Sequence, residues 1–387
     1  MAAEIEVSVI IPCLNEAGTV AASVRQAISA LSEAKLDGEV IVADNGSTDG
    51  SRELAAGAGA RVVPVSSRGY GHALMGGIAA ARANYIIMGD GDGSYDFGEV
   101  PNFVAALREG YDLVQGCRFP SGGGRIEAGA MRFMHRRIGN PLLTRLARLM
   151  FGTRLNDIYC GLRGFNRGFI ERAELRCTGM EFATEMIIRA AQLNARVTEI
   201  PIVLSRDGRE GRPSHLRTFR DGWRTLRLFL LNSPSYLFLA PGMILIGLGV
   251  LGSVLALQGA PIGPATLGVH TLLVSSLLIL VGAQSTFMAI FAFTFALVEK
   301  LRPGNTFILK FYRYFNLEIA LAVAGIVGIV GTALIATAFL DWRAGGYGPL
   351  DYSHSLRIVI PGFTLMALAA LAIISSFMVS ILGLDRK

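Results

Sequence analysis

Three aspartates stand close together in "YIIMGDGDGSYD", namely Asp90, Asp92 and Asp96. An apolar run typical of a buried strand precedes them. A calcium loop of the EF-hand type that began at Asp90 would need Gly as its sixth residue and Glu as its twelfth, but the chain has Tyr95 and Pro101 there. Two alternatives remain. One is a solvated turn, and the other is a site for Mg²⁺ or Mn²⁺ on a diphosphate, which two carboxylates separated by a glycine can supply with oxygen ligands.

A second polar strand end, "VIVADNGSTDGS", favours the ligand-binding alternative. It places Asp44 and Asp49 directly after another apolar run. We interpret Asp49 as part of an ordinary helix start, because Ser47 or Thr48 is placed to cap the helix that follows. Asp44 is different, since a carboxylate at a strand end in a cleft can accept a hydrogen bond from a nucleobase N–H group.

The elements that must position these residues alternate in type. Helical patterns such as residues 19–36 and 72–83 separate the apolar β-branched runs "VSVII", "VIVAD", "RVVPV", "YIIMGD" and "DLVQGC". This alternation predicts a largely parallel sheet with helices on both faces, which is a doubly wound α/β fold. Ligands bind beyond the carboxyl ends of such strands, so the polar strand tails should line one cleft.

Only part of the chain belongs to that sheet. Of its 387 residues, 52% are hydrophobic and 17% charged, which is too apolar for an ordinary soluble chain. Nearly all the charge precedes Asn232, so we expect a globular domain over residues 1–213 and a membrane domain over residues 235–387. The four cysteines fall in the globular half without CxxC spacing, which indicates reduced thiols in the cytosol.

Four apolar blocks, residues 236–257, 267–298, 317–340 and 358–384, are long enough to cross a hydrocarbon core of about 30 Å. The second connection between them is rich in Lys and Arg and the first has none, which places the second in the cytoplasm. The N-terminus lacks the pattern of a secretory signal. We therefore expect a multi-pass protein of the cell inner membrane with its catalytic domain and both termini in the cytoplasm. Four spans exceed what an anchor needs, which leaves homo-oligomer formation and lipid delivery open as further uses.

Residues 214–234 link the two halves. In "LRTFRDGWRTLRLFLLNSP", arginines recur at helical spacing from Arg217 to Arg227, beside an apolar stripe that includes Trp223. The pattern predicts a basic amphipathic helix in the membrane interface, which would hold the cleft against the bilayer. The alternative is a core helix of the soluble domain.

Five motifs in order resemble the family 2 glycosyltransferases of the GT-A fold, and within them the dolichol-phosphate or polyprenyl-phosphate sugar synthases: "SVIIPCLNE", "VADNGSTDGS", "GDGDGSYD", "DIYCGLRGF" and "EIPIVLSRDGREGRPSH". The resemblance covers about residues 5–230. It implies Mg²⁺ or Mn²⁺ as cofactor, held by Asp90, Asp92 and Ser94. It also implies donor-nucleotide binding by Pro12, Asn15, Glu16, Asp44 and Asp90. The chain departs from the family pattern at Ser94, often Gln, at Asn45, usually Asp, and at Cys160, usually Ser.

Sugar transfer from a nucleoside diphosphate needs charge stabilisation on the departing diphosphate, which a metal and arginines supply. A lipid phosphate acceptor is already an anion, so it needs positioning by arginines more than it needs a general base. The resemblance implies lipid-phosphate binding by Arg118, Arg132, Arg136, Arg206 and Ser214, and catalytic roles for Asp157, Arg118 and Arg163. Asp157 has two open alternatives, which are action at the acceptor, also as a base, and a structural hold on a nearby arginine. Glu181 and Glu185 share one helix face, where one is expected to face the sugar and the other to pair with an arginine.

The leading hypothesis is an inverting, metal-dependent enzyme that makes a polyprenyl-phosphate monosaccharide from a UDP- or GDP-sugar. Its partners would be the donor, the polyprenyl phosphate and membrane lipid. A processive polysaccharide synthase is the first alternative, although no QxxRW-type sequence precedes the spans. A non-catalytic scaffold or flippase subunit with a degenerate transferase domain is the second. Juxtamembrane arginines that meet anionic lipid explain the sequence pI of about 9.3, so nucleic acid is not expected as a partner.

Overall fold

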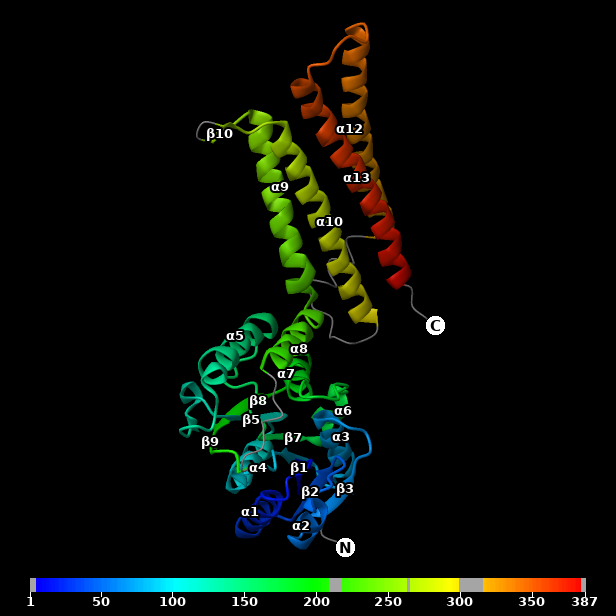
Figure 1. Cartoon of the computed structure of the whole chain (residues 1–387). Helices are drawn as coiled ribbons and strands as arrows, with labels where there is room; N and C mark the ends of the chain where they lie inside the picture. Colours follow the sequence, from blue (N-terminus) through cyan, green and yellow to red (C-terminus); the bar gives the residue numbers. More distant parts are fainter. Residues whose placement is uncertain (1–4, 209–217, 263–264, 299–315, 384–387) are drawn as a thin grey trace. The chain divides into compact units, whose positions relative to one another are not determined.

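The computed structural model describes residues 5–208, 218–262, 265–298 and 316–383 (Figure 1). The chain forms two compact units, which are divided in the sequence between Asn232 and Ser233. A sheet with covering helices builds the first unit, and long apolar helices build the second.

A seven-stranded sheet in the order β3-β2-β1-β4-β7-β5-β8 forms the centre of the first unit. The strands are β1 (Val7–Cys13), β2 (Gly38–Asp44), β3 (Arg61–Pro64), β4 (Tyr85–Met88), β5 (Leu113–Cys117), β7 (Arg163–Asn166) and β8 (Val197–Pro201). Neighbours pair in parallel except β7, which runs antiparallel to both β4 and β5. The prediction of a largely parallel α/β sheet is confirmed, while β7 and β8 were not predicted. The short strands β6 (Arg125–Ile126) and β9 (Val203–Leu204) form a separate parallel pair.

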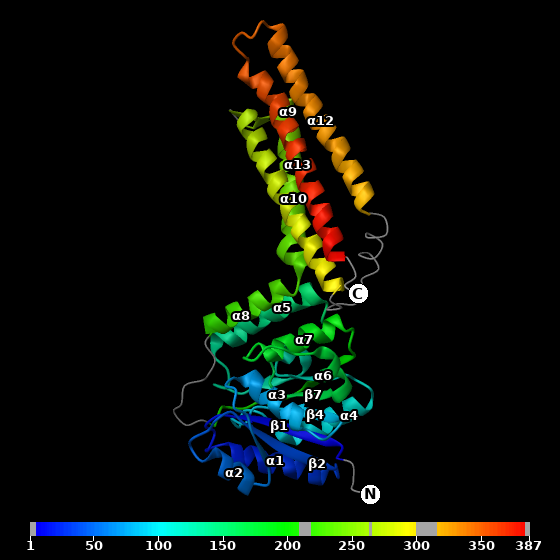
Figure 2. The same ribbon diagram turned by 90° about the vertical axis from the view of Figure 1, so that its right-hand side faces the viewer.

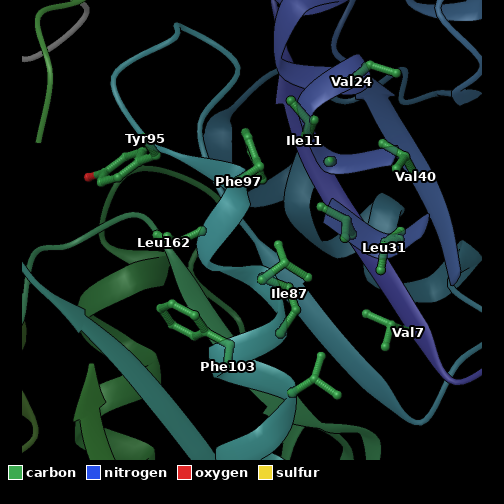
Figure 3. Packing of buried hydrophobic residues seen from close by; sticks show 14 of the residues in the cluster. Val7, Ile11, Val24, Leu31, Val40, Ile87, Tyr95, Phe97, Phe103 and Leu162 are labelled. Carbon is green, nitrogen blue, oxygen red and sulfur yellow. The ribbon is translucent and has the colours of Figure 1, made fainter. Parts of the chain in front are cut away.

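Helices cover both faces of this sheet. Successive side chains of a strand point to opposite faces, and in these strands the side chains on both faces are largely apolar, so both faces need cover. In β1, Val7 and Ile11 point into one hydrophobic cluster (Figure 3), and Ile10 belongs to the other. The first cluster includes side chains from α1 (Val20–Glu33), α2 (Ser51–Gly57) and α4 (Val100–Arg108). The second includes side chains from α3 (Tyr70–Ala80), α5 (Asn140–Phe151), α6 (Arg167–Ala173) and α7 (Phe182–Gln192).

The carboxyl ends of β1, β2 and β4 meet at one edge of the sheet. Cys13 pairs with Asp44 in the register of β1 and β2. Directly after β4, the Gly89 N–H group donates to the carbonyl oxygen of Ile10 at 3.1 Å. The two aspartate-bearing strand tails, which begin at Asp44 and Asp90, therefore leave the sheet on the same side, as the parallel arrangement predicts.

The helix α8 (Thr218–Leu231) packs against α5 and α7 within the first unit (Figure 2). One face is buried, since Phe229 is 1% exposed. The other face is open, since Phe219 is 89% and Trp223 61% exposed. The core-helix alternative describes the buried face of α8. The interfacial alternative stays a prediction, which concerns the face that exposes apolar and basic side chains.

In its described residues, the second unit contains four helical stretches long and apolar enough to cross a membrane, Ser235–Gln258, Val269–Val298, Leu317–Ala344 and Tyr352–Gly383. The long helices within them are α9 (Ala240–Gln258), α10 (Val269–Val298), α12 (Leu317–Ala344) and α13 (Tyr352–Gly383). α13 begins at Tyr352, earlier than predicted, and continues through Pro361, which membrane helices tolerate. The basic connection that set the predicted orientation, residues 299–313, lies outside the described residues.

Close backbone approach explains part of the glycine content of these helices. A Cβ atom at Gly242 of α9 would lie 2.8 Å from the carbonyl oxygen of Gly282 in α10, and one at Gly331 of α12 would lie 2.8 Å from the carbonyl oxygen of Gly362 in α13. Small residues at such crossings let membrane helices pack without a side chain between them.

Candidate active site

A pocket of about 420 Å³ lies at the carboxyl edge of the sheet in the first unit. Three groups of side chains line it. The aspartate-rich loop supplies Asp90, Asp92, Ser94 and Tyr95; the segment before and within α5 supplies Met131, Arg132, His135, Asn140 and Leu143; and the start of α7 and the first half of α8 supply Glu181, Asp221 and Thr225. Arg118 and Tyr159 also line it, which brings together residues more than a hundred positions apart in the sequence.

The predicted metal ligands Asp90, Asp92 and Ser94 all line this pocket. The Oδ1 atom of Asp92 accepts hydrogen bonds from the Ser94 hydroxyl at 2.6 Å and from the Ser94 N–H group at 3.0 Å. Asp96, the third aspartate of the stretch, instead caps a short helix by accepting from Gly98 N–H at 2.8 Å. Asp90 and Asp92 of this loop therefore line the pocket, whereas Asp96 stabilises the local structure.

These three residues fit a divalent cation that is shared with a ligand. Their donor atoms are hard oxygens, the type that Mg²⁺ and Mn²⁺ prefer, and such ions commonly keep further positions for water or phosphate oxygens. Among the described residues, no group of three or more His, Cys, Asp or Glu side chains is arranged to hold a metal. A cation here would therefore take the rest of its ligands from a diphosphate and water.

Tyr70, which the sequence did not single out, holds the first of these carboxylates. Its hydroxyl donates to Asp90 Oδ1 at 2.8 Å. Burial and then the Asp90 charge raise the pKa of Tyr70 well above its ordinary value, so the phenol stays protonated and remains a donor. Gly161 closes in from the other side, because a Cβ atom there would lie 2.5 Å from Asp90 Oδ2. Tyr70 lies in "SRGYGHA", which follows the third apolar run, and this sequence pattern does not show Asp90 as its partner.

Four residues predicted to bind the nucleotide lie at the same edge of the sheet without lining the 420 Å³ pocket: Pro12, Asn15, Glu16 and Asp44. Two of them, Asn15 and Glu16, form hydrogen bonds with the segment that follows β2. Asn15 Oδ1 accepts from Thr48 N–H at 2.8 Å, and Glu16 N–H donates to the Ser51 hydroxyl at 2.8 Å.

Asp44 itself is fully buried and contacts Arg52 Nε at 2.5 Å. Burial raises its pKa, but hydrogen bonds from Ser47, Arg52 and Gly46 outweigh that effect and hold the pKa of Asp44 below its ordinary value. Asn45 donates to the carbonyl oxygens of Val65 and Ser67, so it orders the neighbouring loop. The segment that follows β2 is therefore held in place by several side-chain hydrogen bonds.

Arg118 and Asp157 form a buried ion pair at the pocket wall. Asp157 accepts from Arg118 Nε at 2.6 Å and Nη2 at 2.9 Å, and its side chain has no exposed surface. Burial opposes the charge of Arg118, but the Asp157 carboxylate more than offsets it and raises the pKa of Arg118. Arg118 lines the pocket and Asp157 does not. The geometry therefore supports the structural alternative for Asp157: it orients Arg118.

A further carboxylate fixes the loop that carries Asp157. Glu199 of β8 accepts from the backbone N–H groups of Asn156 at 2.6 Å and Asp157 at 2.9 Å. Its other oxygen accepts from the Asn156 side chain at 2.7 Å. The sequence did not single out Glu199, because its partners lie more than forty residues away.

Arg163, predicted as catalytic, is placed away from the pocket. It is fully buried and donates to the backbone carbonyl oxygens of Cys160, Ile158 and Ala183. Burial lowers the pKa of Arg163 from its ordinary value. Arg163 ties β7 to the 158–160 turn and to α7 and does not line this pocket, so its catalytic role stays a prediction that this position does not favour.

The candidates for lipid-phosphate binding separate into three groups. Arg118 and Arg132 line the pocket. Arg136 and Arg206 do not, and Arg206 donates through Nε to the carbonyl oxygen of Ala128 at 2.6 Å. Ser214 lies outside the described residues.

Between Glu181 and Glu185, Glu185 is the structural one. It accepts from the N–H groups of Arg176 and Cys177 at 2.9 and 2.7 Å. Glu181 lines the pocket and also pairs with Arg224 of α8 at 3.3 Å. We expected one glutamate to face the sugar and the other to pair with an arginine. In the structure Glu181 both lines the pocket and pairs with the arginine, whereas Glu185 binds backbone N–H groups.

Residues 8–173 match the family model described as "Glycosyl transferase family 2", and residues 290–383 match the "Glycosyltransferase family 2 C-terminal transmembrane region". The low-salt glycan biosynthesis hexosyltransferase Agl6 of Haloferax volcanii is 37% identical over 89% of this chain and 81% of its own length. This chain belongs to glycosyltransferase family 2. Four apolar helices of its described residues lie within the matched transmembrane region or just before it. This family 2 glycosyltransferase is therefore an integral membrane protein.

Other relatives of this family 2 glycosyltransferase cover shorter regions. A dolichyl-phosphate hexose transferase of Haloferax volcanii is 32% identical over 42% of this chain and 68% of its own length. An undecaprenyl-phosphate 4-deoxy-4-formamido-L-arabinose transferase of Aeromonas hydrophila is 30% identical over 51% of this chain and 59% of its own length. Among solved structures, glucosyl-3-phosphoglycerate synthase from Mycobacterium tuberculosis, in complex with Mn²⁺, UDP and phosphoglyceric acid, has a TM-score of 0.46 at 23% identity over 59% of this chain and 78% of that chain.

Proposed function

We propose that this family 2 glycosyltransferase transfers a hexose from a UDP- or GDP-sugar to a polyprenyl phosphate, of the dolichyl or undecaprenyl type. The observation that carries the proposal is one pocket that is lined both by Asp90 and Asp92 and by Arg118 and Arg132. Carboxylates suit a cation on a diphosphate, and guanidinium groups suit a phosphate acceptor. Relatives named for transfer to dolichyl and undecaprenyl phosphate support this acceptor class.

The proposed reaction is a single displacement. An oxygen of the lipid phosphate forms a bond to the anomeric carbon while the bond from that carbon to the diphosphate oxygen breaks, so the nucleoside diphosphate leaves with the electron pair and the configuration inverts. The acceptor is already an anion, so no proton has to be removed. This agrees with Asp157 being committed to Arg118 at 2.6 Å.

Each pocket residue has a part in this proposal. A Mg²⁺ or Mn²⁺ held by Asp90, Asp92 and Ser94 would neutralise the charge that develops on the leaving diphosphate. Arg118, fixed by Asp157, orients the acceptor phosphate, and Arg132 adds a second positive charge. The Glu181 carboxylate can accept hydrogen bonds from sugar hydroxyls, since it lines the same pocket.

We propose that transfer takes place at the cytoplasmic face of the cell inner membrane, giving a polyprenyl-phosphate monosaccharide for later glycan or glycolipid assembly. The proposed division is a catalytic domain over residues 1–213, an interfacial helix over 214–234 and a membrane domain over 235–387. The exposed side chains Phe219 and Trp223 of α8 support the interfacial assignment, because such residues are stable at the boundary of headgroups and acyl chains.

The test is a transfer assay with the purified full-length protein, a short polyprenyl phosphate and Mn²⁺ or Mg²⁺. Radiolabelled UDP-glucose, UDP-N-acetylglucosamine and GDP-mannose are compared for label that enters the organic phase. We expect a product with one sugar from one donor, abolished by EDTA and by Asp92→Asn. Asp96→Asn is the matched control, because Asp96 belongs to the same stretch but does not line the pocket; it caps a short helix and accepts from the Gln26 side chain.

Two results would overturn the proposal. A long polymer would show a processive synthase. Absence of both transfer and nucleotide binding from every donor, in a folded protein, would show a non-catalytic scaffold.

A further inference from the structure

A second groove lies along the C-terminal half of α8, beside the segment from Arg176 to Glu181. It has a volume of about 440 Å³. Three arginines line it, Arg176 from the loop before α7 and Arg224 and Arg227 from α8, together with Leu228 and Leu231. Glu181 is the residue that this groove shares with the catalytic pocket.

The charge of this basic groove is not neutralised by its surroundings. Glu181 is the one carboxylate in its lining and pairs with Arg224 at 3.3 Å. Arg176 meets Glu174 at 3.4 Å, but both side chains are about two-thirds exposed, where such a contact is weak. No carboxylate of the described residues pairs with Arg227, which is exposed. An arginine cluster of this kind binds phosphate well, because each guanidinium offers a planar fork of N–H donors.

The apolar end of the groove points to a lipid rather than a soluble phosphate. Leu228 and Leu231 continue the lining beyond the arginines, and Leu231 is 61% exposed. Only three residues separate Leu231 from the first apolar span, which begins at Ser235. The four Cα–Cα steps from Leu231 to Ser235 span at most on the order of 14 Å. The chain itself therefore keeps this end of α8 near the headgroup layer of the bilayer.

We propose that the basic groove of Arg176, Arg224 and Arg227 binds the phosphate of a membrane lipid, with the lipid chain against Leu228 and Leu231. The groove is separate from the site proposed for the acceptor phosphate, which Arg118 and Arg132 form. The phosphate could belong to a bulk anionic phospholipid or to a polyprenyl phosphate, since both present a phosphate on an apolar chain. The inference does not depend on the sugar-transfer reaction.

The test measures lipid retention by the purified full-length protein with native mass spectrometry in detergent. Phosphatidylglycerol, phosphatidylcholine and a short polyprenyl phosphate are titrated separately, and inorganic phosphate is added as a competitor. The groove variant is Arg176→Gln with Arg227→Gln. The matched control is Arg25→Gln with Arg154→Gln, which removes the same charge from exposed residues outside both cavities and outside α8.

We expect the wild type and the control to retain phosphatidylglycerol or the polyprenyl phosphate with similar affinity, and the groove variant to bind it about tenfold more weakly. The lipid that shows this difference identifies the source of the phosphate. Equal weakening in the control would overturn the proposal, because the effect would then be general charge. Equal retention of phosphatidylcholine, or displacement by millimolar inorganic phosphate, would also overturn it.

Discussion

Asp157→Asn is the substitution that most directly separates the two alternatives for Asp157. In the structure one oxygen of Asp157 accepts from Arg118 N–H and Nε, and the other accepts from Arg118 Nη2 and Tyr159 N–H. An asparagine keeps one of these oxygens and replaces the other by an NH₂ group that faces two donors. Two hydrogen bonds are lost, and the guanidinium of Arg118 is left buried without a counter-charge.

The cost of this change can be estimated from the burial of the pair. The side chains of Arg118 and Asp157 are 8% and 0% exposed, so water cannot replace the lost contacts. Removing one partner of such a pair costs about 3–5 kcal/mol. For a domain of this size about 1 kcal/mol shifts the melting temperature by about 2–4 °C, so we expect Asp157→Asn to lower it by at least about 6 °C.

The assay is thermal unfolding of the full-length protein in detergent, followed by the intrinsic fluorescence of its two tryptophans. Glu6→Gln is the control, since it breaks the exposed Glu6–Arg108 pair and should change the melting temperature little. If Asp157→Asn does not yield folded protein, Arg118→Met with Asp157→Asn removes both charges and should be more stable than Asp157→Asn alone. A melting temperature within about 2 °C of the wild type, with transfer lost, would refute the positioning role and favour a catalytic base.

Three further predictions follow from contacts in the same unit. Tyr70→Phe removes the donor to Asp90 and should weaken Mn²⁺ binding in the presence of nucleoside diphosphate by about tenfold, measured by electron paramagnetic resonance of free Mn²⁺; an unchanged midpoint would contradict the role of Tyr70. Gly161→Ala places a Cβ atom 2.5 Å from Asp90 Oδ2 and should weaken the same binding, whereas Gly57→Ala, where the added Cβ meets nothing within 4 Å, should not. Asp44 has a folded-state pKa below its unfolded value of 3.8, so its stabilising contribution is complete above that value and lost as the pH falls through the folded pKa. Melting temperatures from pH 7 to pH 3 should therefore fall less steeply for Asp44→Asn than for the wild type, and parallel curves would count against the prediction.

Part of the candidate site could be read from the sequence because its residues are local to single motifs. Asp90 and Asp92 lie within one loop, so their spacing placed them together, and the family resemblance implied Ser94 beside them. Glu199 and Tyr70 could not be found in this way, since each acts through a partner in a distant segment. Arg163 was assigned to catalysis by its motif, but its three carbonyl acceptors come from segments that only folding brings to β7.

The sequence by itself determined the first five strands of the sheet and the apolar membrane-spanning stretches, because apolar periodicity and length set which segments become buried. It did not show β7 and β8. It did not determine which charges meet. Asp157 contacts Arg118 only because folding brings their two segments together. In the same way, Glu181 meets Arg224 only because α7 and α8 are packed together. Hydrophobic patterning acts along one segment at a time, whereas ion pairs and pockets arise between segments, so only the tertiary structure decided them.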